Sequence, residues 1–230
     1  MTSVAKPVED SGLEALFRAL AAHPTLHARF INTISLMEYI GARKIMKSQQ
    51  DVEFDLELLS HVAEESKHAW LVKRLALRVD KNAAATYAPE HLLCKEQAEG
   101  YLQAIDAAAE LALADVDMTG ASFSKTWLNY LYSSLLIEER ADTFYKVYAV
   151  VLEELGLAGT VRAILKDETK HLAAMANRIE QYDPDARVRL AGLRVKERAA
   201  FARWEEALWA ELNLAALSQN VISEVALGRA

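Results

Sequence analysis

The chain has 230 residues, with 26 Lys plus Arg against 33 Asp plus Glu, which gives a formal net charge of −7. Its 8 glycines and 4 prolines are too few for a turn-rich all-β fold, and the acidic balance without a basic stripe argues against a nucleic-acid or anionic-membrane surface. The single cysteine excludes an internal disulfide and any metal site that needs two or more thiolates. It also favours a reducing, cytoplasmic compartment, and no apolar run reaches the length of a membrane span.

Helical periodicity runs through most of the chain, because apolar residues recur at steps of three or four. A short helix is predicted over residues 11–22, where Ser11 and Glu14 have the spacing of a capping box. Asp51 is the expected cap of a later helix, and residues 80–95 are expected to form a crossover. The longer helices are predicted over about 25–48, 51–79, 95–115, 124–155, 160–182 and 186–216.

These elements predict an all-α protein. Two long helix pairs joined by a long connection are typical of a four-helix bundle, which we expect over about 25–182. Additional helices should pack outside it, the C-terminal ones over about 185–225. Nothing resembles an inter-domain linker, so we expect residues 1–230 to form a single domain.

A Glu-x-x-His motif occurs once in each half of the chain. Glu65 and His68 lie in EESKH, and Glu168 and His171 lie in DETKH. Positions i and i+3 share one face of a helix, so a carboxylate and an imidazole at this spacing can bind one metal ion. The alternative is two ordinary polar pairs on helix surfaces.

The helix that precedes each motif carries a glutamate within an apolar run, Glu38 in ISLMEYIG and Glu138 in LLIE. A buried carboxylate is costly unless it is paired, protonated or metal-bound. Glu138 is favoured over Glu139 because the residues at steps of three and seven from Glu138 are more apolar, whereas Glu139 should face solvent or a basic residue. The alternative is that Arg43, Arg140 or a tyrosine hydroxyl holds each inward carboxylate.

The two halves therefore form an internal repeat offset by about 100 residues. Four carboxylates and two neutral imidazoles would balance the charge of two divalent cations. Nitrogen and oxygen donors without thiolate suit two iron ions, with manganese or a mixed Mn/Fe pair as the alternative. The predicted metal ligands are Glu38, Glu65, His68, Glu138, Glu168 and His171.

Other side chains are expected beside the metal ions. His61 lies on the same helix face as the first Glu-x-x-His and is expected behind the ligands rather than as a seventh ligand. Tyr39 and Tyr145 are expected to line the site or to relay electrons, with core packing as the alternative. Gly41 and Ala42 follow a predicted ligand by about one turn and would leave space for a substrate.

These motifs resemble those of the ferritin-like diiron-carboxylate proteins, over about residues 25–182. EESKH and DETKH are similar to the Glu-Glu-x-Arg-His and Asp-Glu-x-Arg-His motifs of soluble acyl desaturases and bacterial multicomponent monooxygenases, with Lys67 and Lys170 at the arginine positions. LLIE and KDETKH also look like segments of the cyanobacterial aldehyde-deformylating oxygenases. In such families the acid before the second Glu-x-x-His accepts a hydrogen bond from a ligand histidine, which implies this role for Asp167.

The resemblance implies an O2-activating non-haem diiron oxidase or oxygenase that acts on a small or lipid-like organic substrate. The sequence carries no flavin, nicotinamide or iron–sulfur motif, so we expect an external electron donor. The expected partners are O2 and a small molecule, not nucleic acid, and a homodimer fits this interpretation. The alternatives are a ferroxidase, another iron-handling or peroxidase-type ferritin-like protein, and a non-catalytic helical scaffold.

Overall fold

The computed structural model describes residues 8–48, 55–119, 121 and 123–226. Within these ranges the chain forms seven α-helices and no strand, together with a short 3-10 turn at Pro89–His91. The prediction of an all-α protein is therefore confirmed. The helices are α1 (Val8–Ala21), α2 (Pro24–Ser48), α3 (Leu56–Val79), α4 (Lys95–Ala112), α5 (Lys125–Glu154), α6 (Gly159–Tyr182) and α7 (Ala186–Ala226).

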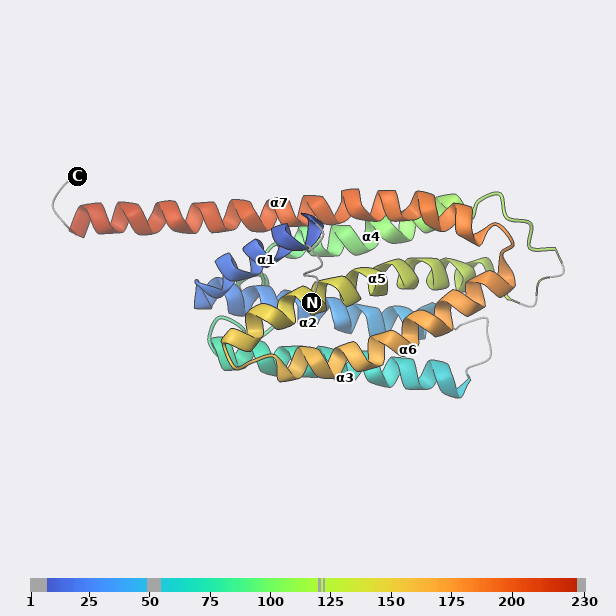
Figure 1. Ribbon diagram of the computed structural model, residues 1–230, viewed down its shortest axis with the longest axis horizontal. Coiled ribbons are helices and arrows are strands. Elements are labelled where there is room, and N and C mark those ends of the chain that lie inside the picture. The colour runs from blue at the N-terminus through green and yellow to red at the C-terminus, as the bar shows by residue number, and fades with distance from the viewer. Residues whose placement is uncertain (1–7, 49–54, 120, 122, 227–230) are drawn as a thin grey trace, which may run out of the picture.

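Paired packing organises the helices (Figure 1). The helix α2 lies antiparallel to α3, and α5 lies antiparallel to α6. Contacts between α3 and α6 and between α2 and α5 join the two pairs, so the four helices that carry the predicted ligands lie together. The helices α4 and α7 pack against each other and cover α5, and the C-terminal part of α7 extends past the other helices.

Capping residues set where the helices begin. The predicted cap Asp51 lies outside the described residues, and α3 begins instead at Leu56, where the Asp55 carboxylate accepts a hydrogen bond from the Leu58 amide at 2.8 Å. Ser124 caps α5 in the same way. Between α5 and α6, Gly156 has a φ of +68°, a left-handed conformation that favours glycine.

The C-terminal segment differs from the prediction. Instead of a helix that stops near residue 216, or several packing helices, α7 is one continuous helix of 41 residues. No glycine or proline interrupts its last thirty or so positions. Its N-terminal part, up to about residue 212, packs into the core through side chains that include Phe201, Trp204 and Leu208, which are buried.

Buried polar groups of α2 hold the crossover against the bundle. The Asn32 amide donates to the carbonyls of Thr86 and His91 at 2.7 and 2.8 Å, and the Thr33 hydroxyl donates to the carbonyl of Leu93. These bonds satisfy loop carbonyls that have no helical partner.

None of the described helices combines the length and the apolar composition that a membrane crossing requires.

Candidate metal centre

The structure brings all six predicted ligands into one buried region. They form two groups, in each of which one donor atom per residue lies within 4.8 Å of all the others. Glu65 belongs to both groups and so lies between them. The first group is Glu38, Glu65, His68 and Glu168, and the second is His61, Glu65, Glu138 and His171.

Helix geometry explains why these residues meet. The helices α3 and α6 each present a Glu-x-x-His toward the bundle interior, and α2 and α5 each present one glutamate. His68 is 0% exposed and Glu168 is 2% exposed, so the donor atoms are shielded from water. The side chain of Glu38 keeps 11% exposure and is the most accessible of the six.

Each motif supplies an acceptor for the histidine of the other motif. The His68 Nε2 lies 3.2 Å from the Asp167 carboxylate, and the His171 Nε2 lies 2.8 Å from the Glu64 carboxylate. Asp167 thus lies where the resemblance implied, but sequence reasoning missed Glu64. The signal was present, because an acid precedes the glutamate in both EESKH and DETKH. Anchoring Nε2 leaves Nδ1 of each ring facing the carboxylates.

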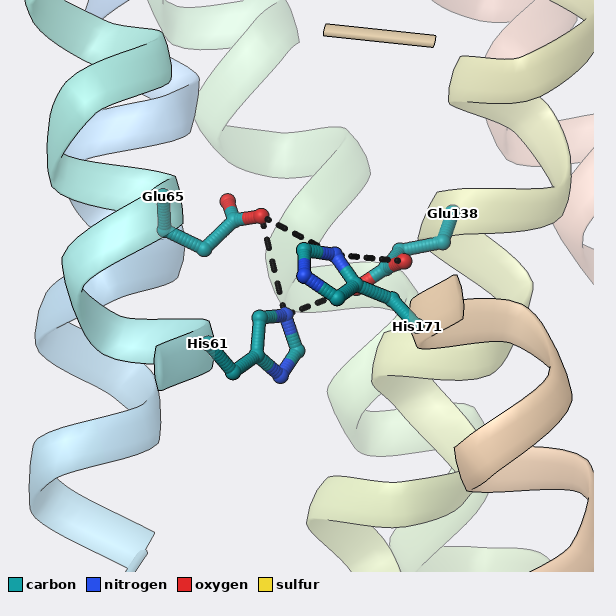
Figure 2. Close-up of side chains that lie close together, drawn as sticks. All are labelled: His61, Glu65, Glu138 and His171. Atoms are coloured by element: carbon teal, nitrogen blue, oxygen red, sulfur yellow. Dashed lines mark ion pairs between the residues drawn. The ribbon is translucent and has the colours of Figure 1, made fainter. Parts of the chain in front are cut away.

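His61 lies among the predicted ligands rather than behind them, as Figure 2 shows. Its Nε2 is 3.0 Å from a Glu138 oxygen and 3.6 Å from a Glu65 oxygen. Its ring centroid is 3.9 Å from that of His171. The sequence placed His61 on the correct face of α3, but helical spacing does not say how far a ring reaches across a bundle.

Buried atoms without partners show that the site fits a cation. Among the described residues, eight buried side-chain nitrogen and oxygen atoms lack a hydrogen bond, and six of them belong to this site. Leaving such an atom unsatisfied costs about 1–3 kcal/mol. Metal ions bound between these atoms would satisfy all six. They are His61 Nε2, Glu65 Oε1, His68 Nδ1, Glu138 Oε2, Glu168 Oε2 and His171 Nδ1.

Protons compete with metal ions for these side chains. Burial lowers the pKa of His68, but the neighbouring carboxylates outweigh burial and raise it to about 11. The same balance raises the pKa of His171 to about 11 and that of His61 to about 9. Burial, followed by the charge of Glu65, raises the pKa of Glu38 well above its usual range. Metal ions would replace these protons as the positive charge in the site.

An apolar cavity of about 130 Å³ adjoins both groups. Glu38, Glu65 and Glu168 line it together with apolar side chains from α2, α5 and α7. Gly41 also lines it, and a Cβ added there would stand 3.2 Å from Glu65 Oε2. The absence of that Cβ therefore leaves the space that the sequence predicted at this position.

The other residues expected near the metal ions lie in different surroundings. The Tyr145 hydroxyl donates to Glu38 Oε1 and lines the cavity. Tyr39 is 44% exposed and stacks on Tyr87 with ring centroids 6.4 Å apart, so the structure does not bring it to the site. Ala42 is buried but does not line the cavity.

Arginines do not hold the two inward carboxylates. Arg140 forms two hydrogen bonds of 2.8 Å with Glu197, and Arg43 lies over the ring of Tyr39. Of the side chains expected as partners of Glu38 and Glu138, only a tyrosine contacts one of them in the described part of the chain: the Tyr145 hydroxyl donates to Glu38. Glu139 faces away from the site and pairs with Arg194 at 2.6 and 2.8 Å.

No protein-family model, curated protein or solved structure matches this chain. The site is therefore the basis for inferring function. It belongs to an all-helical protein whose two buried groups of histidines and glutamates can hold metal ions.

Proposed function

We propose that this chain is an O2-activating non-haem diiron oxidase or oxygenase built on a ferritin-like bundle. The observation that carries the proposal is the pair of donor groups that share Glu65, which four helices bring together and in which six buried donor atoms lack a hydrogen bond. A Glu from each of two helices and a Glu-x-x-His from each of the other two form the ligand set of diiron and dimanganese carboxylate bundles. Nitrogen and oxygen donors without thiolate favour iron.

Two iron ions, when bound, would supply the reduction of O2 and the oxidation of an organic substrate. The protein's own residues position the donors. Glu64 and Asp167 fix the rings of His171 and His68, and the Tyr145 hydroxyl fixes one oxygen of Glu38. We also propose that electrons come from an external donor, since the sequence carries no motif for a second redox cofactor.

The cavity supports a small apolar substrate. A dry apolar cavity of about 150 Å³ is large enough to bind benzene, and the cavity beside the clusters measures about 130 Å³. A longer molecule would have to extend out of it. The apolar walls comprise Ile34, Met37, Ile40, Ile45, Leu102, Ile137, Ala141, Phe144, Phe201 and Trp204.

The lysine and the arginine that line the cavity are already paired, which disfavours an anionic substrate. Lys44 pairs with Asp106 and donates to the Ser133 hydroxyl at 2.6 Å. Arg140 pairs with Glu197, which also accepts a hydrogen bond from the Tyr101 hydroxyl at 3.0 Å. An anionic substrate would have to break one of these part-buried pairs to find a cationic partner, which is costly.

Metal analysis and O2 exposure test the proposal. Protein purified without chelators, or loaded anaerobically with ferrous iron, should hold about two iron ions per chain and should show a transient absorbing species when it meets O2. The Glu65→Ala variant should lose both properties. The Glu168→Ala variant loses a donor of the first group only, so it should retain about one iron ion and lose the transient species. Glu139→Ala is the matched control, because Glu139 lies one residue from a predicted ligand but pairs with Arg194 outside the site.

The outcomes separate the alternatives. Little or no iron, with no change in the Glu65→Ala and Glu168→Ala variants, would leave a helical scaffold as the better interpretation. Hundreds of irons per assembly, together with a large cage in size-exclusion chromatography, would indicate storage. About two manganese ions per chain, with no response to ferrous iron, would move the proposal to manganese chemistry.

A further inference from the structure

We infer that His61 is a metal ligand, so that the two metal positions are chemically unequal. The position formed by the second group would have two imidazoles, from His61 and His171, whereas the position formed by the first group would have one, from His68. This inference rests on the proposed function, because it presupposes that the centre holds a pair of metal ions.

The rings of His61, His68 and His171 have the same kind of surroundings. In each ring one nitrogen meets an anchoring group and the other faces the carboxylates. For His68 and His171 the anchors are Asp167 and Glu64, and for His61 the anchor is the Tyr130 hydroxyl, 3.2 Å from Nδ1. A ligand histidine is oriented in this manner by a hydrogen bond at its other nitrogen.

The Nε2 of His61 faces two carboxylates of the site and forms no hydrogen bond of good geometry. His61 is 6% exposed, and its Nε2 is one of the six unsatisfied atoms of the site. Glu138 and Glu65, its nearest carboxylates, belong to the same group of donors. Figure 2 shows the ring pointing toward the space between these carboxylates and His171. The buried histidine His27 provides a contrast, because it contacts the Tyr148 hydroxyl at 2.6 Å and belongs to neither group.

His61 has no counterpart in the other half of the internal repeat. The position four residues before the motif glutamate is His61 in α3 but Ile164 in α6. The position eight residues before the single glutamate is Tyr130 in α5 but Phe30 in α2. The histidine and its tyrosine anchor thus occur together in one half, and two buried apolar residues replace them in the other.

Unequal ligand sets predict unequal metal preferences. A position with two imidazoles suits Cu²⁺ and Zn²⁺ better than one with three carboxylates and a single imidazole, which suits Mn²⁺. One equivalent of a nitrogen-preferring ion should therefore occupy the His61 position first. Cu²⁺ is a useful probe, because nitrogen ligands split its electron paramagnetic resonance signal.

The experiment adds one equivalent of Cu²⁺ to metal-free protein and counts the coupled nitrogens. We expect two in the wild type, one in His61→Ala and one in His171→Ala. His68→Ala is the matched control, since it changes the same residue type on the same helix as His61 but should leave the two-nitrogen signal unchanged. In a parallel titration, His61→Ala should weaken Fe²⁺ binding at one position more than 100-fold and leave the other within a few fold.

Failure of this inference differs from failure of the proposed function. Two results would overturn the role of His61: a wild-type Cu²⁺ signal with one nitrogen, or a two-nitrogen signal that persists in His61→Ala. In either case, two iron ions per chain would still support a diiron centre. If the wild type binds neither Cu²⁺ nor Fe²⁺ at this site, the proposed function fails. If His61→Ala does not fold, the other proteins still decide the matter: a one-nitrogen signal in the wild type would overturn the inference, and a two-nitrogen signal that persists in His68→Ala would support it.

Discussion

Glu65 is shared by both groups of donors, so its loss should have a larger effect than the loss of any other ligand. In Glu38→Ala only the first group loses a donor, and in Glu138→Ala only the second group does. We therefore expect Glu65→Ala to lose both metal ions and each of the other two variants to retain about one. The measurement is metal content after equilibrium dialysis against Co²⁺ or Fe²⁺ under anaerobic conditions.

Thermal unfolding gives the magnitude of this effect. A site filled at 100 times its dissociation constant stabilises the native state by about 2.7 kcal/mol. For a protein of this size 1 kcal/mol shifts the Tm by about 2–4 °C, so each filled position should add about 5–10 °C. Metal addition should raise the Tm of the wild type by about twice the shift seen in Glu38→Ala, and should not change that of Glu65→Ala. Equal shifts in Glu38→Ala and Glu65→Ala would refute the shared role of Glu65.

Three further predictions concern residues around the centre and in the core. Glu64→Ala and Asp167→Ala should each weaken metal binding about 10–100-fold without removing a ligand, as competition with a metal indicator will show. Gly41→Ala should make the metal-free protein more stable by up to about 1 kcal/mol, because alanine favours the helix; denaturant unfolding measures this effect. The same substitution should weaken metal binding, because its Cβ would crowd Glu65 Oε2 at 3.2 Å, and equilibrium dialysis measures that effect. Burial lowers the pKa of His27 from 6.5 to about 4, so the unfolded chain takes up this proton first as the pH falls. The free energy of unfolding should therefore decrease by up to about 3 kcal/mol between pH 6.5 and 4. His27→Gln should lack this contribution in denaturant unfolding at several pH values, and an unchanged pH dependence would contradict it.

The helical fold could be predicted from the sequence because long amphipathic periods and few breakers leave little choice. The predicted ends of α2 and α6 fall within one or two residues of those observed. The length of α7 was harder to predict, because its C-terminal part extends beyond the other helices. Periodicity that reflects packing against a core therefore provides little information there.

The predicted ligands also follow from local spacing, since i and i+3 positions must share a helix face. The sequence-based predictions failed where they depended on how far a side chain reaches across the bundle or in which direction it points. Tyr39 follows a predicted ligand directly, and a step of one residue turns a side chain to another face, where Tyr39 meets Tyr87. His61 has a suitable face, but only the packing of α3 against α6 shows that its ring reaches Glu138 and His171.

The most direct test of a two-metal centre is Mössbauer spectroscopy of the protein loaded with about two ⁵⁷Fe²⁺ ions per chain and then exposed to O2. A pair of ferric ions in adjoining positions that share Glu65 should give the spectrum of a magnetically coupled diferric pair. The Glu65→Ala variant should not produce it. A spectrum of isolated ferric ions in the wild type, or iron that fails to bind at all, would contradict the account.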